Sequence, residues 1–551
     1  MSPEKTADPR RRSFYRKLAY VAGICLLLFP LFVLGHPATH GTRDTPGRSG
    51  GVLAQLRNDP EHGFSQTQLG EIDMTSETFK LATLGMRGIA VQVLWAKYNK
   101  YRMQKNFSFA WDLLQQLKQL APHFTKVWEH LAWDITYNVS VAQDDYKDKF
   151  FWVVGGAKYL KEGIALNGRE PRLPRELGRF ISQKVGRADE TPLYRALFRD
   201  EAWFQTEGEG LPLNAGYNEQ TQTREPLDLR DNWQVGKAWY REAERVLAEY
   251  HVYAPGLSRP VFYSDAPLAQ MYYAMALEKD GSFGADAQQA WRTAGRDWHE
   301  FGERELPAGD EGTVRLNDYE PLVQEANECT TALDKLAPGV RDEIRGEKVA
   351  KLRSAERKAL DTPADKRTED EVRAAYEAQS RIEVTNDEVA NRLAQSLRRQ
   401  LRKLPRDSEE AQGMERKAKE ALSLAQRAAK AQEQAKRIDR QRSIVNFAHW
   451  RLRAEVEQTR DMLDARRAIY DADQAMAGAR IAAALAGYEN GFALWRKVID
   501  SHPALADDSD FGYDVVEAVG RYRRARGQDE KADLPQPFIL QDVLNKHEKR
   551  R

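Results

Sequence analysis

Three arginines, Arg172, Arg175 and Arg179, stand three and four residues apart, so in a helix they share one face. A guanidinium forms paired hydrogen bonds with a carboxylate and also packs against aromatic rings. Such a face suits a carboxylate or an acidic peptide as partner. The same arginines could instead form a solvated face, or pair with neighbouring acids such as Glu170 and Glu176.

The helices that must position these arginines are indicated by the spacing of small, large and proline residues. One group of residues has the spacing that closes a helix pair of about 34 residues: Ala110, Leu114, Leu117 and Pro122. The next helix carries Trp128, Leu131 and Ala132, its partner helix carries Gly156, Leu160 and Gly163, and Leu177 and Gly178 begin the unit again. In such repeats each hairpin buries one stripe and needs a neighbour to cover its other face.

These residues resemble the tetratricopeptide (TPR) signature. The resemblance implies an all-α fold, an irregular TPR-like solenoid of helical hairpins, with a concave face for a protein partner. It also implies the groove-facing side chains, which are Lys126, Glu129, Trp133 and Tyr137 on one helix and Arg172, Arg175, Arg179 and Gln183 on the next. Gly163 and Pro174 depart from the signature, which leaves an irregular helical domain as the alternative.

A second resemblance covers more of the chain. The segments VWEHLAWDITYNVS, REPRLPRELGRFISQKVGRADE and YENGFALWRKVIDSHP, together with the N-terminal segment, are similar to uncharacterised membrane-anchored helical-repeat proteins of planctomycete-type bacteria. This likeness implies a bacterial cell-envelope protein and carries no activity with it.

The N-terminus predicts a membrane segment. Basic residues precede an apolar run from Leu18 to Gly35, which is just long enough for a bilayer core that needs ~20 residues. The charge asymmetry predicts a cytoplasmic N-terminus and an extracytoplasmic remainder. We expect an uncleaved signal anchor; cleavage after Gly35, and twin-arginine export through Arg11 and Arg12, are the alternatives.

Composition changes along the chain indicate its organisation. We expect the following segments in chain order: a basic tail (1–17), a transmembrane segment (18–35), a flexible spacer (36–74), a first block of TPR-like repeats (75–205), a second helical subdomain (206–304), a linker (305–338), a charged helical arm (339–442), C-terminal TPR-like helices (443–526) and a tail (527–551). In the tail, Phe538, Ile539, Leu540 and Val543 are expected to dock on the last helix.

The later blocks have patterns of their own. Ala287, Trp291, Ala294 and Trp298 follow one helix face, and the stretch 443–470 is expected to form one long helix. Gly491, Trp495, Val498 and Pro503 repeat the closing spacing. The arm has mixed charge and alanine as its main apolar residue, so we expect exposed helices broken at Pro363 and Pro405, with a coiled coil or self-association as the alternative.

Composition and motifs reduce the number of function classes that fit this chain. A net charge of +1 removes the global basic footprint of a nucleic-acid binder, and Cys25 and Cys329 cannot build a disulfide framework. The common phosphate-loop, dinucleotide and zinc patterns do not occur, and the match of 47–51 to G-x-S-x-G lies in the spacer. We therefore expect no catalytic, cofactor or metal site.

The sequence predicts a membrane-anchored scaffold that binds a protein or an acidic peptide. An envelope enzyme with an unrecognised helical active site and an oligomerising spacer remain as alternatives.

Overall fold

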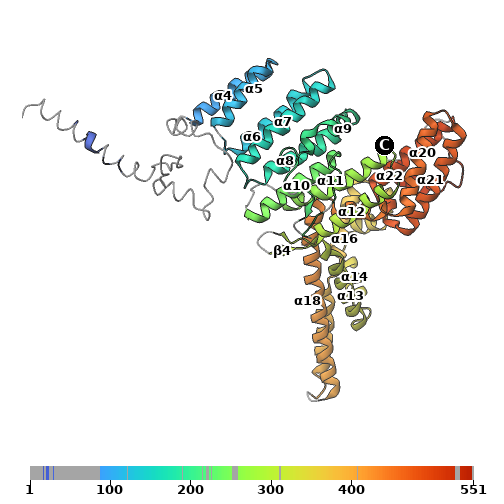
Figure 1. Ribbon diagram of the computed structural model, residues 1–551. Helices are drawn as coiled ribbons and strands as arrows, with labels where there is room; N and C mark the ends of the chain where they lie inside the picture. Colours follow the sequence, from blue (N-terminus) through green and yellow to red (C-terminus); the bar gives the residue numbers. More distant parts are fainter. Residues whose placement is uncertain are drawn as a thin grey trace, which may run out of the picture. The chain divides into compact units, whose positions relative to one another are not determined.

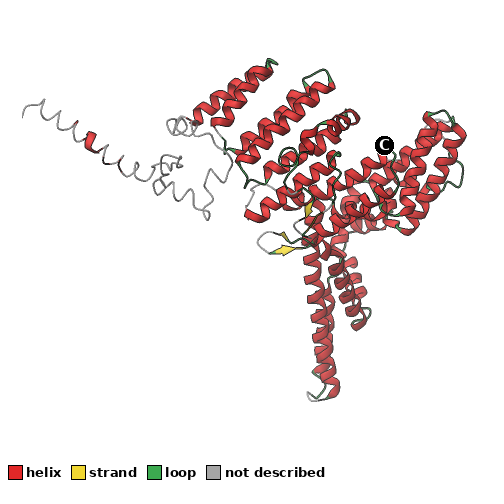
Figure 2. Cartoon of the chain, viewed as in Figure 1, coloured by secondary structure: helices red, strands yellow, loops and turns green. Residues whose placement is uncertain are grey.

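The computed structural model describes residues 87–548, except 121, 189, 214, 219–221, 225, 251–257, 309–311, 406–407 and 528–533, together with scattered residues between 17 and 29. The described chain is all-α, as the sequence predicts, with two short two-stranded ladders (Figure 2). The expected basic tail, spacer, repeat start at Thr75 and most of the segment 18–35 lie outside these residues. Among the described residues no helix is long and apolar enough to cross a membrane.

The chain divides into two compact units, Met1–Gly256 and Leu257–Arg551. This division falls inside the range 206–304, which the sequence indicated as one subdomain. The reason is that α10 (Asn232–Tyr250) packs on helices that precede it, whereas α11 (Arg259–Lys279) pairs with α12 (Ala285–Glu303).

The first unit is a series of helical hairpins (Figure 1). In chain order its elements are α4 (Arg87–Met103), α5 (Phe107–Leu120), α6 (Thr125–Trp133), η2 (Asp134–Val139), α7 (Tyr146–Leu166), α8 (Arg172–Arg179), η3 (Phe180–Lys184), α9 (Thr191–Asp200), η4 (Ala202–Gln205), β1 (Tyr217–Asn218), β2 (Thr223–Arg224) and α10. The segments η2 and η3 are π-helical continuations of α6 and α8. Helix α4 pairs with α5, α6 with α7, and α8 with α10.

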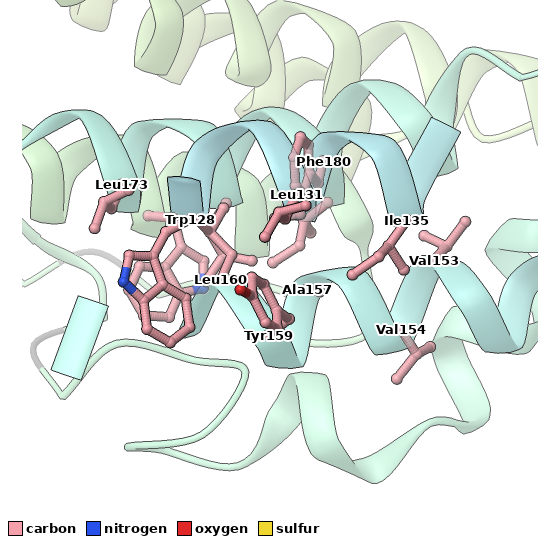
Figure 3. Close-up of a cluster of buried hydrophobic side chains, with 14 of the residues drawn as sticks. Trp128, Leu131, Ile135, Val153, Val154, Ala157, Tyr159, Leu160, Leu173 and Phe180 are labelled. Carbon is pink, nitrogen blue, oxygen red and sulfur yellow. The ribbon is translucent and has the colours of Figure 1, made fainter. Parts of the chain in front are cut away.

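Small residues allow α7 to approach α6 closely, as the sequence spacing predicted. Trp128 is fully buried, and a Cβ added at Gly163 would lie 2.7 Å from its ring (Figure 3). A Cβ at Gly156 would lie 2.1 Å from the Thr136 hydroxyl oxygen. Glycine replaces the usual alanine at 163 because the indole occupies the space of a methyl group.

Pro122 closes the preceding hairpin through its carbonyl group. The carbonyl oxygen accepts hydrogen bonds from Trp128 Nε1 and Asn167 Nδ2, each at 2.8 Å. Because a buried indole N–H needs an acceptor, this contact fixes the turn before α6 to the core.

Helices α8 and α10 also cross closely. A Cβ at Gly178 would lie 3.0 Å from the carbonyl oxygen of Gly236, and one at Gly236 would lie 2.7 Å from Ser182 Cβ. Pro174 is tolerated because it lies in the first turn of α8, where a backbone N–H has no acceptor within the helix.

The second unit contains paired helices and the charged arm. Its elements are α11, α12, β3 (Leu306–Pro307), β4 (Thr313–Val314), η6 (Leu316–Asp318), α13 (Tyr319–Leu336), α14 (Val340–Ala350), α15 (Ser354–Asp361), η7 (Ala364–Lys366), α16 (Glu369–Ile382), α17 (Asn386–Leu401), α18 (Glu409–Ile444), α19 (Phe447–Glu457), α20 (Arg460–Ala477), α21 (Ile481–Ser501), η8 (Pro503–Asp507), α22 (Ser509–Ala525) and α23 (Gln541–His547). The expected stripe of α12 is fully buried, since Trp291 and Trp298 have no exposed surface, and α12 packs against both α11 and α19.

The arm begins earlier than the sequence indicated. The expected linker 305–338 contains α13, which packs along α18 together with α17 (Figure 1). Alanine recurs every three or four residues on the buried face of α18, at Ala421, Ala425, Ala428, Ala431 and Ala435. Methyl groups therefore form this contact, and α15 and α17 end before Pro363 and Pro405.

The expected long helix over 443–470 is divided. Asn446 adopts φ 51°, which ends α18, and Thr459 caps the start of α20 by accepting a hydrogen bond from Met462 N. Thr459 is therefore the N-cap of α20 and lies at a break in the expected helix. In the tail, Leu540 and Val543 are buried as expected, whereas Ile539 is exposed.

Candidate protein-binding face

The four groove residues predicted on the first helix share one face of α6 and η2. The Lys126 ammonium lies 2.6 Å from the Glu129 carboxylate. The rings of Trp133 and Tyr137 stack with centroids 5.8 Å apart, and 36% of the Trp133 surface is exposed. Two aromatic rings are therefore presented on this face.

The four residues predicted on the next helix lie on α8 and η3, with Arg175 and Gln183 half-buried. Arg179 donates two hydrogen bonds to the Glu176 carboxylate, and Arg172 lies 3.3 Å from Glu170. The alternative of pairing with local acids therefore applies to both arginines. Their charge is partly neutralised, so this face is less basic than the arginine spacing suggested.

The two predicted sets meet at Tyr137. The Arg179 guanidinium lies 5.7 Å from the centre of the Tyr137 ring, and the Lys184 ammonium lies 5.1 Å from it. Cations at these distances are attracted to the ring face. Lys184, on η3, was not among the predicted residues.

The rings continue onto α4. His130 lies between Trp95 and Trp133, with ring centroids 5.0 Å and 6.2 Å apart. We call Trp95, His130, Trp133 and Tyr137 the aromatic stripe. Sequence reasoning missed Trp95 because α4 has apolar residues around much of its circumference, so its groove side could not be recognised. His130, on α6, was not among the predicted groove residues.

Asp134 holds the stripe in place. It is buried at 2% exposure and accepts hydrogen bonds from Tyr98, from Arg102 Nη1 at 2.7 Å and from Asn138 Nδ2 at 2.5 Å. Burial and the Asp134 carboxylate raise the pKa of Tyr98 far above its ordinary value, so the phenol stays protonated and donates. The network ties α4 to η2, which keeps Trp95 beside His130.

The π-helical segments set the spacing of side chains on this face. Each begins two residues after the small residue of its repeat, Ala132 for η2 and Gly178 for η3. Trp133, the last residue of α6, and Tyr137, on η2, are four residues apart, and their rings stack across the start of the π segment. Single π turns within α-helices are frequent at functional sites.

This arrangement is suited to binding. It offers a row of rings that ends beside the Arg179 guanidinium, which fits an extended segment with apolar or aromatic side chains followed by an acidic group. Among the described residues, no group of three or more His, Cys, Asp or Glu could hold a metal ion.

A separate cluster of charged residues lies inside the second unit. Arg466 donates to Glu457 at 2.6 Å and to Asp514 at 2.6 Å, while Trp291 Nε1 donates to Glu278 at 2.7 Å. Burial, followed by the Glu457 charge, raises the pKa of Glu278 from 4.5 to about 7. Sequence reasoning missed this cluster because its members come from α11, α12, α19, α20 and α22.

We expect Glu278→Gln to stabilise the second unit at pH 8 by about 1–2 kcal/mol and to leave it unchanged at pH 4. The folded-state pKa exceeds the unfolded value, so the wild type loses stability as pH rises from 4.5 to about 7. Glutamine cannot ionise and keeps an oxygen for Trp291. Hydrogen exchange of α20 and α21 in the full chain measures the difference.

The matched control is Asp471→Asn, because that carboxylate is 65% exposed on α20. This control should retain the wild-type pH dependence. A Glu278→Gln variant that is less stable than wild type at pH 8 would contradict the prediction, because it would mean that the charged form is the stabilising one.

No protein-family model, curated protein or solved structure matches this chain.

Proposed function

We propose that this protein is a TPR-like scaffold, anchored in the cytoplasmic membrane by residues 18–35, which binds an extended segment of a partner protein on the outer side of that membrane. The aromatic stripe is the observation that carries the proposal. An exposed tryptophan, Trp133, lies beside half-buried Tyr137 and an arginine, and these residue types dominate binding energy at protein interfaces.

Support for the TPR-like architecture comes from the packing of its small residues. Trp128 against Gly163 joins α6 to α7, and a Cβ at Gly491 would lie 2.6 Å from the side chain of Ile469, between α21 and α20. Both contacts involve residues of the repeat spacing. Stacked hairpins of this kind form extended binding surfaces in helical-repeat proteins.

The pairing of the arginines shapes the expected partner. Since Arg172 and Arg179 already contact Glu170 and Glu176, recognition rests first on ring contacts along the stripe. The end at Tyr137, with Arg179 and Lys184 close to its ring, is suited to an acidic side chain or a terminal carboxylate.

The proposed location rests on the N-terminal sequence. Basic residues before Leu18 and the apolar run to Gly35 support a signal anchor with the helical units outside the cytoplasm.

We expect Trp133→Ser to lower recovery of a directly bound partner at least tenfold, because loss of an interface tryptophan costs about 2 kcal/mol or more. The full chain is purified from membranes after chemical cross-linking, and bound proteins are quantified by mass spectrometry. Tyr376→Ser is the control, because Tyr376 is 80% exposed and lies on α16 in the other unit. Equal recovery with both variants would contradict the proposal.

The same preparation tests the acidic end of the ligand. Arg179→Glu reverses the charge beside Tyr137, so it should weaken the same partner, whereas Arg353→Glu changes an arginine that is 70% exposed in the arm and should not. A partner that depends on Trp133 but not on Arg179 would mean that the acidic group is absent from the ligand.

A further inference from the structure

A second exposed apolar feature lies at one end of the first two hairpins, apart from the aromatic stripe. The turn between α4 and α5 and the loop between η2 and α7 lie at the same end of neighbouring hairpins (Figure 2). Large apolar residues in or beside these connections are strongly exposed: Met103 is 77% exposed, Phe109 58%, Val141 63% and Phe151 67%. We call these four residues, of which Phe109 and Phe151 are aromatic, the aromatic rim.

Half-buried rings support the rim from beneath. Tyr101 stacks on Phe109 with centroids 5.5 Å apart. Trp152 contacts Phe107 at 5.8 Å, Trp111 at 6.1 Å and Phe151 at 5.8 Å. Tyr101, Trp111 and Trp152 pack against the hydrophobic core of the unit, so the exposed side chains are carried on a rigid base.

The shape and composition of the rim favour a flat apolar surface as its occupant. The four side chains lie at helix ends and connections, whereas the aromatic stripe runs along helix faces. The rim presents Phe and Met, with Trp and Tyr just beneath them. Protein surfaces that enter the headgroup and acyl boundary of a bilayer have this composition.

The charges around the rim nearly cancel. Exposed Lys100, Lys105 and Lys147 belong to the same segments as exposed Asp112, Asp144, Asp145 and Asp148. The rim therefore lacks the basic excess that draws proteins to anionic lipid, and burial of apolar side chains must supply the binding energy.

The length of the connecting chain allows this contact. Residues 36–86 separate the apolar run from α4, and when extended they span at most about 180 Å. Helix α4 is only about 25 Å long, so its far end can reach the surface in which the anchor is embedded.

We propose that the aromatic rim inserts into the interfacial layer of the bilayer and lays the first unit against the membrane. This inference rests on the proposed membrane location but is independent of partner binding by the stripe. It assigns the rim to lipid and leaves the stripe for the protein ligand.

A fluorescent probe at the rim tests the inference in the full chain. The chain carries Cys25→Ala and Cys329→Ser, and an NBD group is attached through Phe151→Cys or, as control, through Tyr376→Cys. With phosphatidylcholine vesicles we expect a blue-shifted NBD emission and several-fold stronger quenching by headgroup-region nitroxide lipids at position 151 than at 376. Flotation of the vesicles reports attachment by any part of the chain.

The possible outcomes distinguish insertion of the rim from membrane anchoring by residues 18–35. Flotation with equal quenching at 151 and 376 would overturn rim insertion and leave the anchor, while loss of flotation would overturn both. A second variant pair uses Phe109→Asp, which should reduce quenching at 151, and Phe124→Asp, which should not, because Phe124 is 55% exposed at the N-terminal end of α6. Quenching that requires anionic lipid would also overturn insertion driven by apolar contacts.

Discussion

Arg466→Met is expected to destabilise the second unit by about 3–5 kcal/mol at neutral pH. The Arg466 side chain is only 17% exposed, and its guanidinium binds the carboxylates of Glu457 and Asp514. Methionine has a similar length but no charge, so the 3%-exposed Glu457 would lose its closest cation. Arg453, 3.7 Å from the same carboxylate, would be the cation that remains, and a buried carboxylate that loses its hydrogen bonds costs more than the lost contact itself.

Hydrogen exchange across α20, α21 and α22 in the full chain measures this loss. Arg467→Met is the matched control, because Arg467 is 65% exposed and lies 3.7 Å from an equally exposed Asp471, a pair worth well under 1 kcal/mol. Equal exchange in the two variants would show that Arg466 does not balance these carboxylates.

Trp128→Ala is expected to destabilise the first unit by about 3–5 kcal/mol. The indole has no exposed surface, lies 4.8 Å from the Tyr159 ring and donates to the Pro122 carbonyl. Its removal leaves a cavity between α6 and α7, and glycine at 163 has no side chain to fill it. Hydrogen exchange of these two helices is the measurement, with Trp133→Ala as the control because Trp133 is 36% exposed.

A second substitution tests the cause. Gly163→Ala should cost about 1–3 kcal/mol in the wild type, since the added methyl group would meet the Trp128 ring. In the Trp128→Ala background the same change should be neutral or stabilising, because the space is empty and alanine favours the helix. Equal costs in both backgrounds would show that the indole does not set the need for glycine.

The parts that the sequence predicted well depend on local spacing. Trp128, Ala132, Gly156 and Gly163 were recognised because a helix pair repeats small and large residues at distances that hydrophobic periodicity records. The face carrying Trp133 and Tyr137 was inferred from the TPR resemblance and remains a prediction. The prediction was less successful for α13, whose buried side chains include only Ala326, Cys329 and Leu333, too few large apolar residues for a clear period.

The remaining features depend on contacts between distant segments. Trp95 joins the stripe because Tyr98 and Arg102 bind Asp134 more than thirty residues later. The proximity of Glu278 and Glu457 depends on how α11 packs against α19 and α20, and no local pattern encodes it. The sequence left two alternatives for Arg179, which were binding to a partner and pairing with Glu176. The choice depends on the rotamer of Arg179, which the sequence does not give.

The two π turns also bear on how the ends of the two helices face each other. Each begins two residues beyond the Leu131–Ala132 or Leu177–Gly178 pair, and each continues the α-helix that precedes it. A π turn holds more residues than an α turn, so side chains beyond it are displaced around the helix axis. Because both helices widen at the same position, the displacement has the same sense in each, and Tyr137 lies 5.1 Å from the Lys184 ammonium.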